Sequence, residues 1–264
     1  VMAVRCPLLF DLLDQVKPDN AKAELYLTDI VSIATAKALA VTYRTTDKRE
    51  IAGVNSRQDI AHIEAILQDR LRYSAMDQGV TMRAPETVFL SADNSFGRDV
   101  VIEPHVVIGA GTVIGDGSII KSFSYIEGTV LGACCTIGPH ARLGPGTNAD
   151  QGVKIGNFVE TKNATIGAAS KANHLTYIGD TTIGTGANIG AGTITCNYDG
   201  FDKFKTLIGD RASIGSNTAL VAPVSIGAGA IIGAGSTITA DVPSDAIATT
   251  RSALDVRHDA ASRY

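Results

Sequence analysis

The sequence has 264 residues and a formal net charge of −4 at pH 7, so it lacks the basic excess of most nucleic-acid-binding proteins. We therefore expect no nucleic-acid partner. Hydrophobic residues make up 45% of the chain and charged residues 19%, which excludes wholesale disorder. Aromatic residues are only 5%, and glycine occurs 27 times, a composition that favours repetition of a small unit.

Cysteine usage and hydropathy bear on location. The four cysteines contain no C-x-x-C pair, so we expect reduced, mostly buried thiols in a cytoplasmic protein. The stretch from Asn217 to Ala240 is uncharged and long enough to span a bilayer. Its glycines, Pro223 and six-residue rhythm argue against that, so we expect no membrane span.

Residues 1–55 are predicted to be a remnant of an α/β domain. Pro7 to Val16 and Leu27 to Lys37 have the pattern of short amphipathic helices. Leu39 to Tyr43 alternates and is rich in β-branched residues, which is typical of a strand.

Residues 56–84 are predicted to contain a linker helix from Ser56 to about Met76. Ser56 and Asp59 have the spacing of a capping box at its start, and Gly79 ends it. An apolar stripe is expected along the helix, formed by Ile60, Ile63, Leu67 and Leu71.

From Leu90 onward, aliphatic residues recur every six positions, as in Ile102, Ile108, Ile114 and Ile120. Neither a helix nor an alternating strand has this period, which is the signature of a parallel β-helix. Each hexapeptide forms one side of a triangular coil, and successive coils stack about 4.8 Å apart. We expect the β-helix over residues 85–242, followed by a tail over 243–264. The period itself leaves the handedness open.

Residues three sides apart should stack on one face. The count predicts that Ser216 stacks with Ala234. It also places His174 one coil below Asn188 and Ala191.

His174 lies within a polar run, residues 171–177, of an otherwise apolar repeat. The side count also puts Glu160 beside it, and a carboxylate–imidazole pair can support general-base chemistry. A structural histidine is the alternative reading. His105 and His140 are two coils apart on this count, too far to share one zinc ion within a single chain.

The polar run from Gly190 to Gly200 interrupts the repeat, either as a plain surface loop or as a functional one. Cys196 has no adjacent base in the sequence, so we interpret it as structural. Asn55 is interpreted, on its sequence context, as a residue at the entry to the linker helix.

Several blocks of the sequence are distinctive: GNFVETK (Gly156–Lys162), KANHLTYIGD (Lys171–Asp180), NIGAGTITCNYDG (Asn188–Gly200) and KFKTLIGD (Lys203–Asp210), with YLTDI (Tyr26–Ile30) and GVNSR (Gly53–Arg57) nearer the start. These blocks resemble a single bacterial family, the bifunctional N-acetylglucosamine-1-phosphate uridyltransferase/glucosamine-1-phosphate N-acetyltransferases. The resemblance implies a left-handed parallel β-helix and a homotrimer with active sites between subunits.

The resemblance implies acetyl transfer from acetyl-CoA to the amine of glucosamine 1-phosphate, a step toward UDP-N-acetylglucosamine, peptidoglycan and lipopolysaccharide. His174 matches the family's general base, and Glu160 would orient it. Sugar-phosphate contacts are implied for Lys162, Tyr177, Asn188, Asn197 and the basic Lys203. Acetyl-CoA contacts are implied for Ala191, Asn197, Tyr198, Ser216, Ala234 and Arg251.

Two features depart from the family. Gly144 stands where the family usually has an arginine that holds the sugar phosphate, so we expect a raised KM for that substrate. The glycine-rich nucleotide loop of the uridyltransferase half is absent, and we expect no uridyltransferase activity. Asn55 matches a magnesium-binding residue of that half, and its partner carboxylate is missing.

Two alternatives to this function remain open. The protein is then either another hexapeptide acyltransferase or a catalytically impaired trimeric scaffold.

Overall fold

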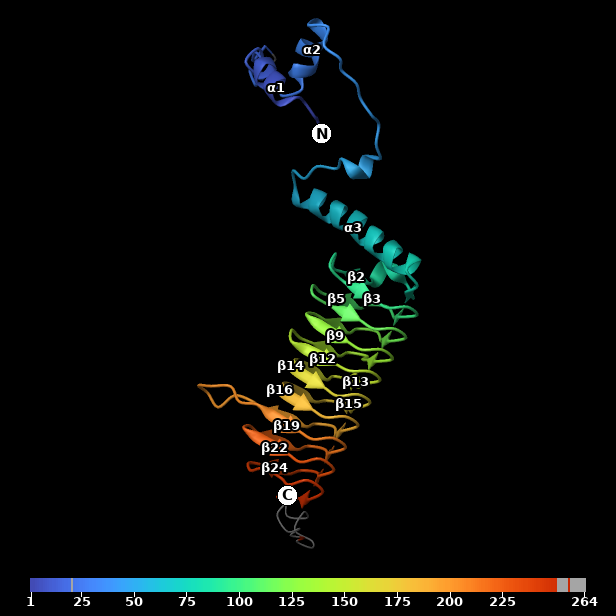
Figure 1. The fold of residues 1–264 in the computed structure, drawn as a ribbon, viewed down its shortest axis with the longest axis vertical. Helices are drawn as coiled ribbons and strands as arrows, with labels where there is room; N and C mark the ends of the chain where they lie inside the picture. The colour runs from blue at the N-terminus through green and yellow to red at the C-terminus, as the bar shows by residue number, and fades with distance from the viewer. Residues whose placement is uncertain (20, 251–255, 257–264) are drawn as a thin grey trace, which may run out of the picture. The chain divides into compact units, whose positions relative to one another are not determined.

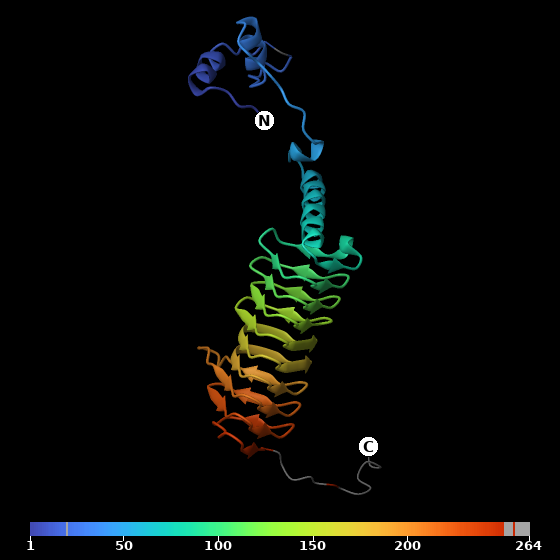
Figure 2. The same ribbon diagram turned by 45° about the vertical axis from the view of Figure 1, so that its right-hand side comes forward.

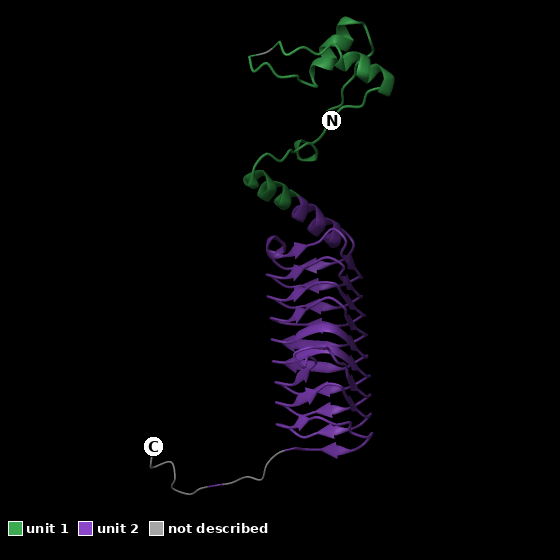
Figure 3. Ribbon diagram, turned by 90° about the vertical axis from the view of Figure 1, so that its left-hand side faces the viewer, with its two compact units in different colours: residues 1–66 green, residues 67–264 purple. Residues whose placement is uncertain are grey.

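The structure is a computed structural model that describes residues 1–19, 21–250 and 256. The chain divides into two compact units, Val1–Ile66 and Leu67–Tyr264 (Figure 3). The division falls within one helix, so we describe each unit by itself.

The first unit is helical and small. It contains α1 (Cys6–Leu13), α2 (Asp29–Ala36) and the 3-10 turn η1 (Lys48–Glu50), and it buries Leu12, Ile30 and Ala34 in its core. The predicted strand at Leu39 to Tyr43 is wrong. An alternating segment becomes a strand only beside a pairing partner, and the described residues up to 66 contain no other strand.

The helix α3 (Arg57–Asp77) confirms the predicted linker helix and its cap. The Asp59 carboxylate accepts hydrogen bonds from the backbone N–H groups of Asn55 and Ser56, at 3.0 and 2.8 Å, and from the Ser56 hydroxyl. The Asp59 N–H in turn donates to Ser56 Oγ at 3.2 Å. These bonds lower the pKa of Asp59, and they place Asn55 at the helix entry, as its sequence context indicates.

The predicted apolar stripe of α3 is only partly buried: Leu71 packs against the β-helix core and Ile63 is half-buried, and the buried residues of the helix are Gln68, Arg72 and Ala75. Ile60 and Leu67 are exposed. The Gln68 amide exchanges two hydrogen bonds with the Leu90 backbone, at 2.7 and 2.9 Å, and Arg72 donates to Val88 O at 3.0 Å. The helix covers backbone groups at the first coil, and such groups need donors and acceptors more than they need apolar contact.

The second unit is a parallel β-helix of hexapeptide repeats, left-handed as the family resemblance implies, with three flat faces (Figures 1 and 2). It begins earlier and ends later than residues 85–242, and the 3-10 turn η2 (Pro85–Thr87) lies within its first coil. One face is a 10-stranded sheet of β1 (Thr81–Met82), β4 (Val101–Ile102), β7 (Ile119–Ile120), β10 (Thr136–Ile137), β13 (Lys154–Asn157), β15 (Lys171–His174), β17 (Asn188–Ile189), β20 (Ser213–Ile214), β23 (Ile231–Ile232) and β25 (Ile247–Ala248).

The other two faces form one 15-stranded sheet, because the long strands β14 (Glu160–Ile166) and β16 (Tyr177–Ile183) continue around a corner and pair on both. The second face holds β2 (Phe89–Leu90), β5 (Val107–Ile108), β8 (Tyr125–Ile126), β11 (Arg142–Leu143), β18 (Ile194–Cys196), β21 (Ala219–Val221) and β24 (Thr237–Ile238). The third holds β3 (Ser95–Phe96), β6 (Val113–Ile114), β9 (Thr129–Leu131), β12 (Thr147–Ala149), β19 (Thr206–Ile208) and β22 (Val224–Ile226).

The six-residue series fills the interior of the coils. Along the first face Ile120, Ile137, Ile155 and Ala172 occupy one register column, each paired with the next. All four side chains are buried, as the period predicts. A column of this kind is buried only when neighbouring coils stack, so the repeats support one another.

One corner carries a stack of alternating imidazole and phenyl rings. His105, Phe123, His140 and Phe158 follow one another at centroid separations of 5.0, 4.9 and 5.1 Å. All four residues have φ between 53° and 62°, a region that residues other than glycine rarely occupy. The separations confirm that His105 and His140 cannot share a zinc ion within one chain. Residue 174 lies one position before this corner, so it does not join the stack.

Candidate functional site

His174 closes β15 and presents its ring to solvent. Its Nδ1 lies 2.7 Å from Oδ1 of Asn157, the residue at the same register one coil earlier. An amide oxygen can only accept, so this hydrogen bond requires the proton on Nδ1 and leaves the Nε2 lone pair available. The ring is therefore held in the tautomer that a general base needs.

The predicted contact between His174 and Glu160 is wrong in the single chain. Glu160 pairs in register with Tyr177, beyond the bend that follows β15, and its carboxylate forms an ion pair with Arg142. Side counting identifies the face of a residue but not its place around a corner. The Arg142 guanidinium is also engaged by Glu160, rather than being free to substitute for an arginine at position 144.

A column of residues leads from His174 toward the C-terminal coils. Ala191 follows His174 one coil up, and Ser216 and Ala234 follow in the next two coils. Hydrogen bonds across the adjoining corner keep this register, from Asn217 N to Ala191 O at 2.7 Å and from Gly235 N to Ser216 O at 2.8 Å. The predicted stacking of Ser216 with Ala234 is confirmed, and the column offers a strip of small side chains beside the imidazole.

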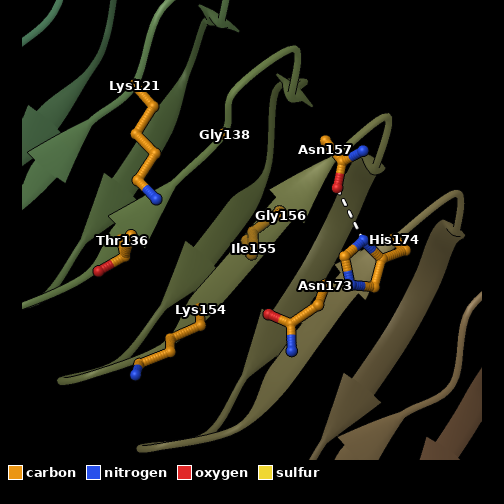
Figure 4. Close-up of a pocket in the computed structure, with 9 residues that line it drawn as sticks. All are labelled: Lys121, Thr136, Gly138, Lys154, Ile155, Gly156, Asn157, Asn173 and His174. Atoms are coloured by element: carbon orange, nitrogen blue, oxygen red, sulfur yellow. Dashed lines mark hydrogen bonds between the residues drawn. The ribbon is translucent and has the colours of Figure 1, made fainter.

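A pocket of about 300 Å³ opens on the other side of His174 (Figure 4). It extends toward the N-terminal coils and is lined by Lys121, Thr136, Gly138, Lys154, Ile155, Gly156, Asn157, Asn173 and His174. The lysines lie at the end away from the imidazole, and the view shows Asn173 between Lys154 and His174. The pocket thus joins a base to two ammonium groups within one chain.

A second polar cluster surrounds Asp180, on β16. Its two carboxylate oxygens accept hydrogen bonds from the side-chain amides of Asn163 and Asn197. Burial raises the pKa of Asp180, but these two bonds and the charges of Lys203 and Lys162 outweigh it, so the pKa lies below its usual value. The cluster brings together Asn197, Lys162 and Lys203, three of the implied substrate contacts.

The break in the repeat between Asn197 and Phe204 is an ordered hairpin. Tyr198 and Lys203 form an antiparallel bridge, and Phe204 N donates to Asn197 O at 2.9 Å. Phe201 at its tip is 91% exposed, which is unusual for an aromatic side chain.

Other implied residues lie apart from these clusters. Tyr177 begins β16 and pairs in register with Glu160 on β14. Asn188 begins β17 and lies one coil above Lys171, on the same face as His174. Asn55 is exposed at the start of α3, and Arg251 lies outside the described residues. Among the residues that the structure describes, no three histidine, cysteine or acidic side chains are placed to hold a metal ion.

The cysteines are less buried than predicted. Cys135 is buried, and burial raises its pKa, but Cys6 and Cys134 are exposed and Cys196 is half-buried. Cys134 lies in a turn of the β-helix and Cys196 at the end of β18, where small side chains reach solvent whatever their hydrophobicity, and Cys6 begins α1. No helix within the described ranges is long and apolar enough to cross a bilayer.

The side chain at position 144 would enter the space beside Lys162. A Cβ there would lie 3.1 Å from Thr161 O and 3.8 Å from the Lys162 Cβ. The φ of Gly144 is not positive, so residues with a side chain can adopt this backbone conformation. The backbone therefore does not require glycine at position 144, and the lack of an arginine there is a difference in side-chain chemistry from the family.

Sequence reasoning missed Asn157, Asp180, Lys121 and Lys154. Asn157 and Asp180 lie inside the blocks GNFVETK and KANHLTYIGD, but the sequence alone assigned no role to either residue. The lysines occupy positions that read as ordinary solvated surface. Only the register across coils, which joins residues 17 or more positions apart, brings them to His174.

The fold and site define a hexapeptide-repeat β-helix of the transferase type. The family model described as "Bacterial transferase hexapeptide (six repeats)" matches residues 95–128 and 205–240. A solved UDP-N-acetylglucosamine acyltransferase, LpxA from Bacteroides fragilis, superposes with a TM-score of 0.52 at 22% identity, over 62% of this chain and 70% of that one. That likeness concerns the fold alone.

Curated relatives extend the match to the whole chain. The Bifunctional protein GlmU of Azorhizobium caulinodans is 54% identical over 95% of this chain and 56% of its own length. That of Sphingopyxis alaskensis is 54% identical over 100% of this chain and 58% of its own length. The family resemblance is thus confirmed: the chain is related to these proteins from end to end and spans rather more than half of their length.

Proposed function

We propose that the protein transfers the acetyl group of acetyl-CoA to the amine of glucosamine 1-phosphate. The observation that carries this is the imidazole of His174, held by Asn157 in the tautomer with a bare Nε2, at the junction of a pocket and an open strip. Identity of 54% to the relatives over the length of the chain supports the same reaction.

The residues of this chain supply the proton chemistry. Nε2 of His174 removes a proton from the substrate ammonium as its nitrogen attacks the thioester carbonyl. The C–N bond forms and the C–S bond breaks, and the second proton that the nitrogen loses on becoming an amide is taken up by the leaving coenzyme A thiolate. Asn157 stabilises the ring throughout, because its oxygen keeps accepting from Nδ1–H while the imidazolium forms.

We place the acetyl-CoA along Ala191, Ser216 and Ala234, because small side chains let an extended chain approach the coil surface. Tyr198, Asn197 and Arg251 are the further contacts that the family match implies. The coenzyme therefore runs from His174 toward the C-terminal coils.

We further propose that the active unit is a homotrimer. His174 lies on the first face, whereas Asp180, Lys162 and Lys203 gather at another corner of the same coils. In one chain these clusters face different directions, and a neighbouring copy would bring the second cluster over the first. Glu160, Tyr177 and Asn188 would complete the site.

We expect no role for magnesium in the acetyl transfer, because His174 supplies its proton chemistry. The exposed free thiols of Cys6 and Cys134 suit a reducing compartment, so we place the protein in the cytoplasm.

Thiol release from acetyl-CoA, followed with and without glucosamine 1-phosphate, tests the proposal. We expect sugar-dependent release that falls about 10²–10⁴-fold in His174→Ala, the usual contribution of a general base. His62→Ala, an exposed histidine on α3, is the matched control and should keep full activity.

Release that persists unchanged in His174→Ala would contradict the mechanism. Sugar-independent acetylation of another amine would point to a different hexapeptide acyltransferase. No release with any amine would favour a scaffold.

A further inference from the structure

We propose that the corner between the first and second faces of the β-helix is the surface on which three copies of this chain meet around a common axis. The inference rests on the proposed function, which shares its site between copies, and adds the residues that hold the copies together. This corner carries the stack of His105, Phe123, His140 and Phe158, and Leu175 occupies the same position one coil further. We call these five residues the ring corner.

The ring corner presents large apolar side chains that the described residues leave uncovered. Phe123, Phe158 and Leu175 are 54%, 57% and 61% exposed, and both histidines are exposed. The rings are nearly parallel and follow one another along the coils, so stacking covers their flat sides and leaves their outer edges in solvent. A continuous exposed apolar column of this kind marks an interaction site.

The residue types at the ring corner are the opposite of those that its backbone favours. All five residues have positive φ, and so do the residues at the other two corners of the same coils. In the coils of His105, Phe123 and His140 those other corners carry small side chains or none, at Gly111, Gly128 and Gly146 and at Gly117, Cys134 and Gly152. Glycine adopts this conformation freely, whereas phenylalanine and leucine are strained in it. A contact in the assembled protein explains why one corner alone carries large side chains at this cost.

The two halves of the proposed site indicate what covers the ring corner. His174 lies on the first face just before this corner, and Glu160 and Tyr177 begin strands of the second face just after it. Three parallel copies around an axis bring the first face of one opposite the second face of the next only when the corner shared by these faces points to the axis. Triangular coils arranged in this way leave a wedge-shaped cleft between neighbours, with His174 on one wall and the partner's Tyr177 on the other.

The column changes character at the level of the base. Beyond Leu175 the same corner continues as Gly192, Asn217 and Gly235, which carry no large apolar group. Each of these residues directly follows one member of the strip on which we place acetyl-CoA, which is formed by Ala191, Ser216 and Ala234. The ring corner thus holds the copies together on the N-terminal side of His174 and leaves the cleft open for the coenzyme on the C-terminal side.

Sedimentation equilibrium of the double variant Phe123→Asn/Phe158→Asn tests the proposal. Asparagine tolerates the left-handed backbone, so this variant removes two rings without adding strain to the coil. We expect the protein concentration at which half of the chains are trimeric to rise at least about tenfold, because aromatic contacts between copies are lost. Cys134→Asn is the matched control, since Cys134 is exposed with a φ of 57° at another corner, and it should assemble like the wild type. Circular dichroism checks that both variants keep the β-helix.

A cross-linking measurement does not depend on the stability of the double variant. His140→Cys, in a Cys6→Ser background, should give covalent dimers with a short bis-maleimide, because one residue 140 from each copy lies beside the axis. The Cys6→Ser chain alone is the control. It keeps the exposed thiol of Cys134 at another corner and should give little covalent dimer.

Two results would overturn the proposal: a double variant that assembles as tightly as Cys134→Asn, or a His140→Cys chain that gives no more covalent dimer than its background. Thiol release from acetyl-CoA separates this proposal from the proposed function. Ring-dependent trimers of a wild type that transfers no acetyl group would support the contact and refute the transferase reaction. Turnover per chain should fall with the trimer fraction as the double variant is diluted. Monomers with full turnover would refute the shared site, and with it the placement of this corner at the axis.

Discussion

The two units of the chain bury their side chains in different ways. In residues 1–66 the buried core consists of Leu12, Ile30 and Ala34, between two short helices. In the β-helix one continuous core runs from Ala75 to Val242, and every coil shares its contacts with the coils above and below. Each repeat of the β-helix gains stability from its neighbouring coils, whereas the core of the helical unit is formed by few side chains.

The largest expected difference in stability comes from truncating one buried side chain in each of the two cores. Ile155→Ala should lower the free energy of unfolding of the β-helix by about 2–5 kcal/mol, because the cavity lies between fixed coils that cannot collapse. Leu12→Ala should leave the β-helix transition unchanged and act only on the first unit. Calorimetry that resolves the unfolding transitions of both variants checks this, and an equal shift of one common transition would contradict it.

Glycine substitutions sharpen the comparison. A Cβ on Gly156 would lie 1.9 Å from Asn173 O, so Gly156→Ala must displace a backbone that positions Asn157 and His174. We expect a loss of about 1–3 kcal/mol in stability, together with reduced acetyl transfer. Gly53→Ala, in the first unit, meets nothing within 4 Å and should be neutral or slightly stabilising. Chemical denaturation of both variants measures the contrast, which would disappear if the coils were loosely packed.

Within the β-helix, the contact between Asn157 and His174 can be changed without altering the core. Asn157→Ala should lower kcat about fivefold, since it removes one hydrogen bond of roughly 1 kcal/mol that selects the tautomer. Asn157→Asp should move the acidic limb of the pH–rate profile to higher pH, because a carboxylate favours the imidazolium. A profile that is unchanged in Asn157→Asp would show that Asn157 does not orient the base.

The smallest effect concerns acid. The pKa of Asp180 is lowered in the folded chain, so its contribution to stability is present above the ordinary aspartate pKa of about 3.9 and is lost as the pH falls through the folded value. The wild type should therefore exceed Asp180→Asn in Tm at pH 7 by more than at pH 3. The same difference at both pH values would show that the ionised carboxylate contributes nothing.

The repeat made the β-helix predictable because one constraint, an inward aliphatic residue, recurs at a fixed interval. The same period could not place corner residues, since β13 and β15 extend to four residues and move Asn157, rather than Glu160, under His174. Gln68 and Arg72 were missed for a different reason. Helix patterns identify apolar faces, and nothing in α3 itself reveals that its partner is a row of backbone groups.

Those hydrogen bonds also limit how the protein can assemble. Parallel β-coils grow by adding backbone to an open edge, so an uncovered first coil would template another chain end to end. The Gln68 amide occupies both hydrogen-bonding groups of Leu90, and the Arg72 guanidinium occupies the carbonyl of Val88. The helix α3 thereby covers part of the open edge of the first coil, because these backbone groups of Val88 and Leu90 cannot pair with a strand of another chain.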